Sequence, residues 1–185
     1  MQFGRHVSAI AGCGVLDHRF HQDERGTFLK VLSATNLERV CAEFTTRELF
    51  WSKSIRGVVR GMHFQIPPFA TTKLVWVSAG LIRDVVLDLR VDSETFGACL
   101  VTELDNEQGG ILIPGGCAHG YEVLSDTAII NYAQDKDHAP AHDMGVAWDS
   151  FGFDWKTKNP ILSDRDRVLP RMSDFQSPFT MSDSA

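Results

Sequence analysis

Two histidines, a lysine and a tyrosine lie in separate apolar segments, and their side chains can move protons or stabilise negative charge. The first histidine lies in Arg60-Gly61-Met62-His63-Phe64-Gln65, and the other residues are Lys73, His119 and Tyr132. An imidazole accepts protons near neutral pH, a phenol is a weak acid, and an ammonium stabilises an oxyanion. If the apolar segments are strands of a closed sheet, they predict a polar pocket for an anionic substrate and proton transfer.

Each of these residues also has a structural interpretation. His63 or His119 could be a core histidine satisfied by hydrogen bonds, and Tyr132 could pack with its hydroxyl satisfied. An iron or zinc site is a third interpretation, and it needs two or three histidines with a carboxylate. The chain contains no His-x-His pair, so we expect no bound metal.

Length and composition predict one globular domain. The chain has 185 residues, of which 43% are hydrophobic and 23% are charged, as is typical of a protein with a single core. We expect one domain over residues 1–185, with its core at about 17–170. The aperiodic segment 176–185 is expected to be a flexible tail that frays or docks loosely.

The net charge of −6 argues against a nucleic-acid-binding protein, which usually carries a basic surplus or stripe. A local cluster of Arg and Lys can still bind a small anion. The four cysteines, Cys13, Cys41, Cys99 and Cys117, show neither Cys-x-x-Cys pairing nor zinc spacing. With no leader pattern and no apolar run of about 18 residues, we expect a cytoplasmic protein with reduced thiols and no membrane partner.

Short apolar and β-branched runs, separated by Gly and Pro, dominate the sequence. We expect strands at 27–32, 57–65, 73–78, 81–90, 97–104, 110–113, 121–124 and 127–133. The one helix that we expect covers residues 36–43, where Thr35 and Glu38 fit a capping box. This organisation predicts an all-β protein, an antiparallel sandwich or barrel.

The segment 81–90 tests whether a strand lines a polar cavity. Alternation puts Leu81, Arg83, Val85, Leu87 and Leu89 on one face and Ile82, Asp84, Val86, Asp88 and Arg90 on the other. Each face mixes apolar and charged residues, so neither is simply solvated. The second face either lines a polar cavity or belongs to an ordinary half-exposed strand.

An ordered set of short motifs covers nearly the whole chain. It comprises Asp23-Glu24-Arg25-Gly26-Thr27-Phe28, Arg60-Gly61-Met62-His63-Phe64-Gln65, Lys73-Leu74-Val75, Asp84-Val85-Val86-Leu87-Asp88-Leu89-Arg90, Ser93-Glu94-Thr95-Phe96-Gly97, Ile113-Pro114, Ala118-His119-Gly120-Tyr121, Trp148-Asp149 and Leu162-Ser163-Asp164-Arg165-Asp166. With this order and spacing, the chain resembles the nucleotide-sugar 3,5-epimerase family typified by dTDP-4-dehydrorhamnose 3,5-epimerase. The resemblance implies a cupin-type jelly-roll barrel, a homodimer, and cofactor-free catalysis on a nucleoside-diphosphate 4-keto-6-deoxyhexose.

The resemblance also implies a role for each site residue. His63 is the base, and Asp166 orients its ring, for which the charged segment around Asp166 must fold over the barrel mouth. Tyr132 is the acid, and Lys73 stabilises the enolate oxygen. The implied substrate-binding residues are Arg25, Arg60, Gln65, Asp84, His119 and Arg165. Among them, Arg25 and Arg60 suit the diphosphate, and Arg25 is expected to serve the neighbouring subunit.

Departures from the family pattern concern substrate recognition. Glu48 and Phe50 stand where many members carry Gln and Asn, and Ala133 stands where a lysine is common. Asp137 and His138 occupy a region where an aromatic pair often stacks on the base. We therefore expect an epimerase whose nucleotide or sugar differs from the thymidine-linked rhamnose precursor, with CDP- or GDP-linked sugars as candidates.

Two other functions stay open. A ketoisomerase would use the same enolate chemistry, but its relatives place two histidines close together on a strand, where this chain has only His63. The second open function is that of a non-catalytic cupin-like module that binds sugar or metal. For the epimerase, inversion at C3 alone or at both C3 and C5 is open, as is the product's use in lipopolysaccharide O-antigen, another surface polysaccharide or a glycosylated compound.

Overall fold

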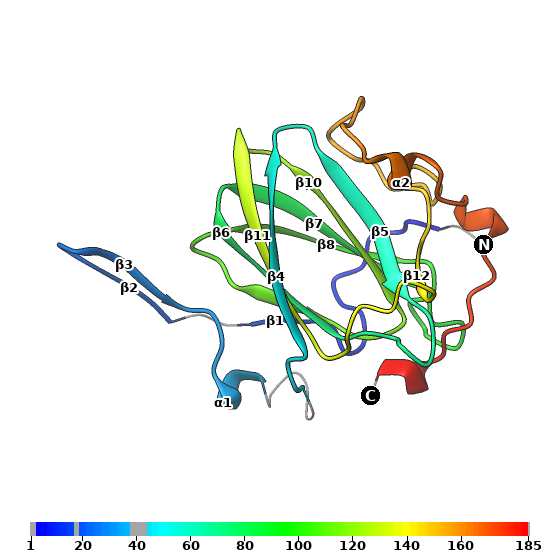
Figure 1. Cartoon of the computed structure of the whole chain (residues 1–185), viewed down its shortest axis with the longest axis horizontal. Coiled ribbons are helices and arrows are strands. Elements are labelled where there is room, and N and C mark those ends of the chain that lie inside the picture. The colour runs from blue at the N-terminus through cyan, green and yellow to red at the C-terminus, as the bar shows by residue number, and fades with distance from the viewer. Residues whose placement is uncertain (1–2, 17–18, 38–43, 185) are drawn as a thin grey trace.

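Figure 1 shows the computed structural model, which describes residues 3–16, 19–37 and 44–184. The strands are β1 (Gly14–Val15), β2 (Arg19–Asp23), β3 (Gly26–Lys30), β4 (Glu48–Ile55), β5 (Val59–Gln65), β6 (Lys73–Ala79), β7 (Leu81–Asp88), β8 (Cys99–Asp105), β9 (Gly110–Ile113), β10 (Cys117–Val123), β11 (Thr127–Gln134) and β12 (Asp143–Gly145). The helical elements are α1 (Ala34–Leu37), α2 (Asp164–Arg167), and the short 3₁₀ helices η1 (Met172–Asp174) and η2 (Met181–Ser184).

Two five-stranded sheets pack face to face. Their strand orders are β1-β9-β6-β11-β4 and β12-β5-β10-β7-β8, and neighbouring strands run antiparallel. From β5 onward the chain passes repeatedly between the sheets, because β6, β9 and β11 belong to one and β7, β8 and β10 to the other. This is the cupin-type jelly roll that the resemblance implies.

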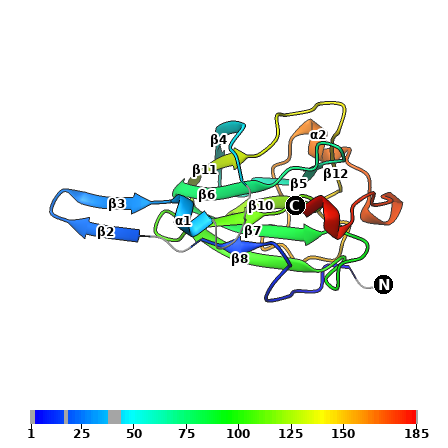
Figure 2. The same cartoon turned by 90° about the horizontal axis from the view of Figure 1, so that it is seen from below.

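The hairpin formed by β2 and β3 lies outside this barrel. It pairs only within itself, with Asp23 opposite Gly26 at its turn. Figures 1 and 2 show it projecting from one end of the molecule, well away from the two sheets. The expected strand at 27–32 therefore exists in part, but it does not belong to the barrel.

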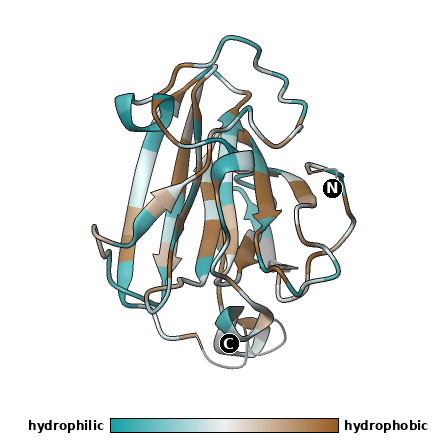
Figure 3. Cartoon of the chain, turned by 90° about the vertical axis from the view of Figure 1, so that its right-hand side faces the viewer, coloured by the Kyte–Doolittle hydropathy of each residue, from teal (hydrophilic) through white to brown (hydrophobic). Residues whose placement is uncertain are grey.

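The core has three parts that follow the faces of the sheets. The inner core, between the sheets, includes Val75, Ile82, Ile111 and Ile130. Residues 146–179 cover the outer face of the sheet that contains β5, and Leu32, Leu37 and Phe44 pack on the outer face of the other sheet. Figure 3 shows hydrophobic and hydrophilic residues interspersed along the strands, as expected when strand residues point alternately to two faces.

The mixed faces of β7 are both buried. Ile82 and Val86 belong to the inner core, and Asp84 between them is 1% exposed, while Val85 and Leu87 pack on the outer side. The second face continues to Asp88, the last residue of β7, and to Arg90 beyond the strand. These two form a fully buried ion pair with an Nε–Oδ1 distance of 2.8 Å. The interpretation of 81–90 as an ordinary half-exposed strand was wrong.

Several elements differ from the sequence expectations, among them β1, β2 and β12, which were not expected. The strand β4 was not expected at all, and β10 begins at Cys117 rather than at residue 121. The helix expected at 36–43 is described only up to Leu37, as part of α1, and the remaining residues of that prediction lie outside the described ranges. Cys41 lies outside them too, and the three described cysteines are unbridged.

The segment expected to be a flexible tail is packed against the barrel. Phe179 is fully buried and contacts Phe64 edge to face, with ring centroids 5.5 Å apart. Its carbonyl accepts a hydrogen bond from the Val91 amide, and the Met181 amide donates to Asp92.

In the parts of the chain that the structure describes, no helix is long and apolar enough to span a membrane.

Candidate active site

Two glycines bring the site histidines together at the centre of one sheet. His63 on β5 and His119 on β10 are cross-strand partners, and the register shifts just beyond them. A Cβ on Gly61 would lie 2.6 Å from the Gly120 Cα, and a Cβ on Gly120 would lie 2.7 Å from the Arg60 carbonyl oxygen. Only residues without a side chain allow this approach, which places both imidazoles at one wall of the interior.

His63 is paired with Asp166, which α2 carries over the barrel. Their Nε2–Oδ1 distance is 2.6 Å, and the side chains are 27% and 2% exposed. Ser163 caps α2 by accepting a hydrogen bond from the Asp166 amide. Burial raises the pKa of Asp166, but hydrogen bonds from His63, Ser163 and the Gly61 amide outweigh it and lower the pKa. The carboxylate is therefore ionised and can orient the ring.

His119 has its own carboxylate partner. Its Nε2 lies 2.6 Å from Asp84 Oδ2, and both side chains are almost completely buried. Asp84 Oδ1 has no hydrogen-bond partner among the described residues. Asp84 was expected to bind substrate; it pairs with His119 and is not among the side chains that line the cavity described below.

Tyr132 projects from β11, in the sheet that faces His63. Its ring stacks on Phe50 of β4 with centroids 4.8 Å apart and planes 13° apart, and it meets His119 edge to face at 6.2 Å. Burial is the main cause that raises the pKa of Tyr132 well above its usual value, and the neighbouring Tyr121 adds to it. The phenol therefore keeps its proton at neutral pH and can act as an acid.

Lys73 reaches the same space from β6. Although Lys73 opens the strand that follows the His63 strand in the sequence, β5 and β6 lie in different sheets. Lys73 is instead opposite Gln134 of β11 and faces His63 across the barrel. Burial lowers the pKa of Lys73 to about 8, with Asp143 raising it and Arg165 lowering it.

These side chains line one cavity that has two lobes. The inner lobe, of about 210 Å³, is lined by Phe50, Ser52, Arg60, His63, Lys73, His119, Gly120, Tyr121 and Tyr132. The outer lobe, of about 510 Å³, is lined by Glu48, Phe50, His63, Gln65, Lys73, Gln134, His138, Asp143 and Arg165. Because His63, Lys73 and Phe50 line both, they stand at the junction of the lobes. The predicted polar pocket is present.

The outer lobe carries a charged cluster around Asp143. Arg165 contacts both oxygens of Asp143, at 2.7 and 2.8 Å, and His138 Nε2 lies 3.1 Å from Oδ2. Burial opposes ionisation of Asp143, but Arg165, His138 and the nearby His63 lower its pKa. Sequence reasoning missed Asp143, because nothing in its local motif marks it apart from other loop carboxylates.

Two lining residues are occupied by structural hydrogen bonds. Gln65 donates to Thr71 Oγ1 at 2.7 Å and accepts from the Ala139 amide at 2.6 Å. The two oxygens of Glu48 accept from Gln134 Nε2 and from the His138 amide. Gln65, which was expected to bind substrate, lines the outer lobe, and these hydrogen bonds fix its position there.

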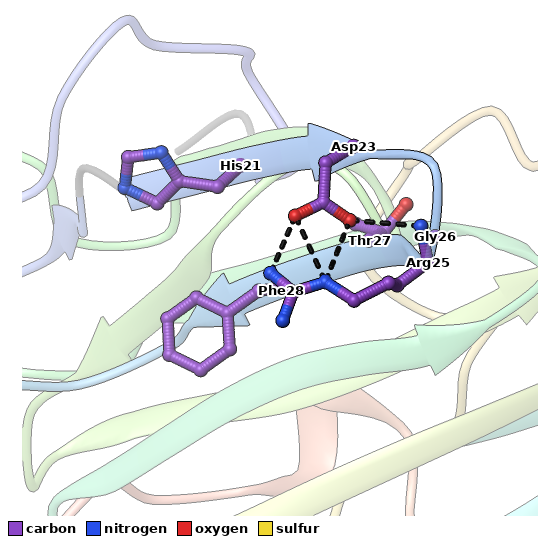
Figure 4. Close-up of a pocket in the computed structure, with 6 residues that line it drawn as sticks. All are labelled: His21, Asp23, Arg25, Gly26, Thr27 and Phe28. Atoms are coloured by element: carbon purple, nitrogen blue, oxygen red, sulfur yellow. Dashed lines mark hydrogen bonds and ion pairs between the residues drawn. The ribbon is translucent and has the colours of Figure 1, made fainter.

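The two arginines expected at the diphosphate lie far apart. Arg60 lines the inner lobe and donates from Nε to Ser54 Oγ at 3.1 Å, whereas Arg25 sits at the tip of the β2–β3 hairpin. Figure 4 shows Arg25 folded back on Asp23 beside a hollow of about 380 Å³ on the hairpin itself. Within one chain, Arg25 does not reach the cavity.

A network of hydroxyls behind the inner lobe was also missed. Tyr121 Oη lies 3.1 Å from Ser52 Oγ and 3.2 Å from Ser54 Oγ. It links β10 to β4, which explains why Tyr121, one of the two tyrosines, is only 1% exposed. Sequence reasoning missed these serines because it did not predict β4. Only in a strand does alternation place Ser52 and Ser54 on the face that points inward.

Among residues 3–16, 19–37 and 44–184, no three His, Cys, Asp or Glu side chains converge as a metal site would require. The two site histidines each pair with a different carboxylate instead of converging on a shared point. What the cavity offers is a base with its orienting carboxylate, a buried phenol and a partly buried ammonium. These groups suit proton abstraction from carbon next to a carbonyl group.

Comparisons with known proteins agree with this chemistry. The sequence model of the dTDP-4-dehydrorhamnose 3,5-epimerase family matches residues 7–174. A dTDP-4-dehydrorhamnose 3,5-epimerase of Shigella flexneri is 35% identical over 160 residues, covering 82% of this chain and 86% of its own.

Solved structures show the same likeness. NovW, a 4-keto-6-deoxy sugar epimerase of Streptomyces spheroides, superposes with a TM-score of 0.90 at 28% identity, covering 100% of this chain and 96% of its own. The Bacillus anthracis dTDP-4-dehydrorhamnose 3,5-epimerase, with TDP and PPi bound, has a TM-score of 0.82 at 36% identity and covers 86% of this chain and 94% of its own.

Proposed function

The chain belongs to the dTDP-4-dehydrorhamnose 3,5-epimerase family and is an epimerase, and we propose that it inverts C3 of a dTDP-linked 4-keto-6-deoxyhexose by an enolate mechanism. The observation that carries this mechanism is the placement of the base and the acid. His63 and Tyr132 project into one lobe from opposite sheets. Inversion requires proton removal from one face of the sugar and proton return to the other, and opposed groups supply both.

The substrate's keto group makes the first step possible. When the C3–H bond breaks, its electron pair delocalises toward the C4 oxygen and forms an enolate. The proton goes to His63. Because Nε2 of His63 is engaged by the Asp166 carboxylate, the tautomer with a proton on Nε2 is favoured and Nδ1 is the nitrogen that accepts.

Lys73 is proposed to stabilise the enolate oxygen. An ammonium held in a partly buried wall stabilises developing negative charge more strongly than a solvated one. Its pKa of about 8 keeps it mostly protonated at neutral pH, and its place beside His63 at the junction of the lobes puts the charge near the reacting carbons.

Tyr132 completes the inversion. Its O–H proton goes to C3 from the face opposite His63, which leaves a tyrosinate and an imidazolium. Exchange of one proton through solvent restores both groups, so the cycle needs no oxidant, reductant or cofactor. The high pKa of Tyr132 favours this rapid return of its proton.

The nucleotide is proposed to be dTDP, and this revises the interpretation drawn from the departures. A similar enzyme binds TDP and PPi, and the family is named for dTDP-linked substrates. Glu48 is tied up by Gln134 and the His138 amide, so it is part of the wall and is no evidence for another nucleotide. Arg60 in the inner lobe and Arg165 in the outer lobe are the cations placed to meet phosphate oxygens.

A homodimer is part of the proposal. The edge strand β4 exposes Leu49, Trp51 and Ile55, which are 70%, 65% and 55% exposed, and such an edge favours pairing with another chain. The projecting hairpin would then carry Arg25 to the neighbouring subunit's cavity. We also propose a cytoplasmic enzyme of deoxysugar biosynthesis whose product enters a surface polysaccharide, such as O-antigen, or another glycosylated compound.

Proton NMR in deuterated water tests the substrate. The enzyme is incubated with dTDP-, CDP- and GDP-linked 4-keto-6-deoxyhexoses, and loss of each ring proton is followed. Fastest loss at C3 with the dTDP sugar supports the proposal, and concurrent loss at C5 extends the inversion to both carbons. A faster CDP or GDP sugar would refute the nucleotide assignment, and no exchange with any sugar would refute the epimerase mechanism.

A further inference from the structure

Phe50 is an apolar ring among polar side chains at the edge of the cavity. Alternation along β4 directs Glu48, Phe50, Ser52 and Ser54 toward the interior. The other three are polar and hydrogen-bonded, whereas Phe50 is 44% exposed and lines both lobes. A half-exposed ring in this position contributes little to the core, so its contact with the cavity residues is what distinguishes it.

The contact that Phe50 makes is with the proposed acid. Phe50 and Tyr132 are direct cross-strand partners of β4 and β11. Their rings lie nearly parallel, at 13°, with centroids 4.8 Å apart, while the His119 ring meets Tyr132 edge to face. The phenol ring is therefore held by one aromatic ring on its face and another at its edge, and rotation of the phenol about its side-chain bonds would break the stack.

From this geometry we infer that Phe50 is a positioning residue: it holds the Tyr132 phenol in line with the reacting carbon and so sets how often the enolate is protonated with inversion. The inference rests on the proposed function, because it assigns Phe50 an effect on the acid of that mechanism. Phe50 itself transfers no proton.

The enolate has two fates, and Phe50 affects only one. It can take a proton back at C3 from His63, which regenerates substrate, or take one from Tyr132, which gives the inverted product. In deuterated water the imidazolium can exchange its proton for deuterium before return. The amount of recovered substrate that carries deuterium at C3 therefore measures return of the proton from His63. The amount of epimer measures protonation by Tyr132.

The experiment measures deuterium entry into recovered substrate and epimer formation in the Phe50→Leu, Phe50→Met and Phe50→Tyr enzymes. Loss of the stacked ring lets the phenol deviate, and misplacement of about 1 Å can cost on the order of a hundredfold in rate. We expect inversion to fall about tenfold or more in the Leu and Met variants, with deuterium entry into recovered substrate within about twofold of wild type. The Tyr variant keeps a ring in place and should retain the wild-type ratio of the two fates.

Phe96→Leu is the matched control, since Phe96 is a partly buried phenylalanine in an aromatic pair with Phe3 and does not line the cavity. It should retain the wild-type ratio. An unchanged ratio in both Phe50→Leu and Phe50→Met, or an equal fall of both fates in folded protein, would overturn the inference. A wild-type enzyme that gives neither exchange nor epimer would instead refute the proposed function, so the two failures are distinguishable.

Discussion

His63 and Asp166 are 103 positions apart in the chain, and their side chains meet in a 2.6 Å hydrogen bond. One lies at the centre of a sheet and the other on a single turn of helix held over it. The bond fixes which nitrogen of His63 faces the cavity. The segment that follows β12 and carries α2 is therefore needed to complete the base.

Asp166→Asn should slow epimerisation by about a hundredfold or more, because a neutral amide neither stabilises the imidazolium nor fixes the same tautomer. The rate is measured by NMR as epimer formed per enzyme. Asp164→Asn is the matched control, since Asp164 lies on the same helix and is exposed. Equal rates for Asp166→Asn and wild type would remove Asp166 from the mechanism.

Tyr132→Phe should separate the two halves of the reaction. The variant keeps the ring that stacks on Phe50 but lacks the proton donor, so deuterium should still enter C3 of recovered substrate while epimer formation falls by about 10²–10⁴-fold. Mass spectrometry and NMR of recovered sugar measure the two quantities. If the variant forms epimer at the wild-type rate, another group or water is the acid.

The lowered pKa of Lys73 predicts that activity and stability change with pH in opposite directions. Its pKa falls from 10.5 to about 8 on folding, so the ammonium that stabilises the enolate is lost as pH rises through about 8, and kcat should decline. Between about 8 and 10.5 the unfolded chain binds the extra proton, so this residue makes stability rise with pH there. The Lys73→Met variant should lose this rise in the free energy of unfolding, which denaturant unfolding measures. A wild-type kcat that stays flat above about pH 8 would contradict the role of the Lys73 ammonium in stabilising the enolate.

Gly120→Ala should destabilise the protein by about 1–3 kcal/mol, the usual cost of overpacking. The added methyl would lie 2.6 Å from Met62 Sδ and 2.7 Å from the Arg60 carbonyl oxygen, so β5 and β10 must separate. Since those strands carry His63 and His119, activity should fall together with the unfolding midpoint. A variant as stable as wild type would mean that the two strands can move apart at no cost.

Chelation should leave the enzyme active. The mechanism uses only side chains, so dialysis against a strong chelator should keep kcat within about twofold of the untreated enzyme, by the same NMR assay. Activity that disappears and returns only with added zinc or iron would show that the cavity works as a metal site.

The sequence predicted most strands of the two sheets but not the short β1 and β12 or the longer β4, and for β4 the reason is physical. A strand is usually recognised by apolar residues facing inward, and β4 reverses this, with Leu49 and Trp51 outside and Ser52 and Ser54 inside. Such a pattern makes sense only where the interior is a polar cavity and the outside meets something apolar. Because β4 lines a polar cavity, its sequence lacks the inward-facing apolar residues by which a strand is usually recognised.

The site residues were predictable as a set, but their connections were not. Alternation along residues 81–90 left open whether Asp84 faces a polar cavity or solvent, and nothing local indicates that it pairs with His119. Likewise, β5 and β6 look like a hairpin in sequence, and only the crossing between sheets puts Lys73 opposite His63. Long-range placement of this kind depends on topology, which periodicity alone does not determine.

Deuterium entry at C3 of a dTDP-linked 4-keto-6-deoxyhexose, compared between wild type and His63→Ala, tests most directly whether His63 is the base. We expect rapid loss of the C3 proton signal with wild type and a rate at least about a hundredfold lower with folded His63→Ala. Equal exchange by the two proteins would contradict the assignment of His63 as the base.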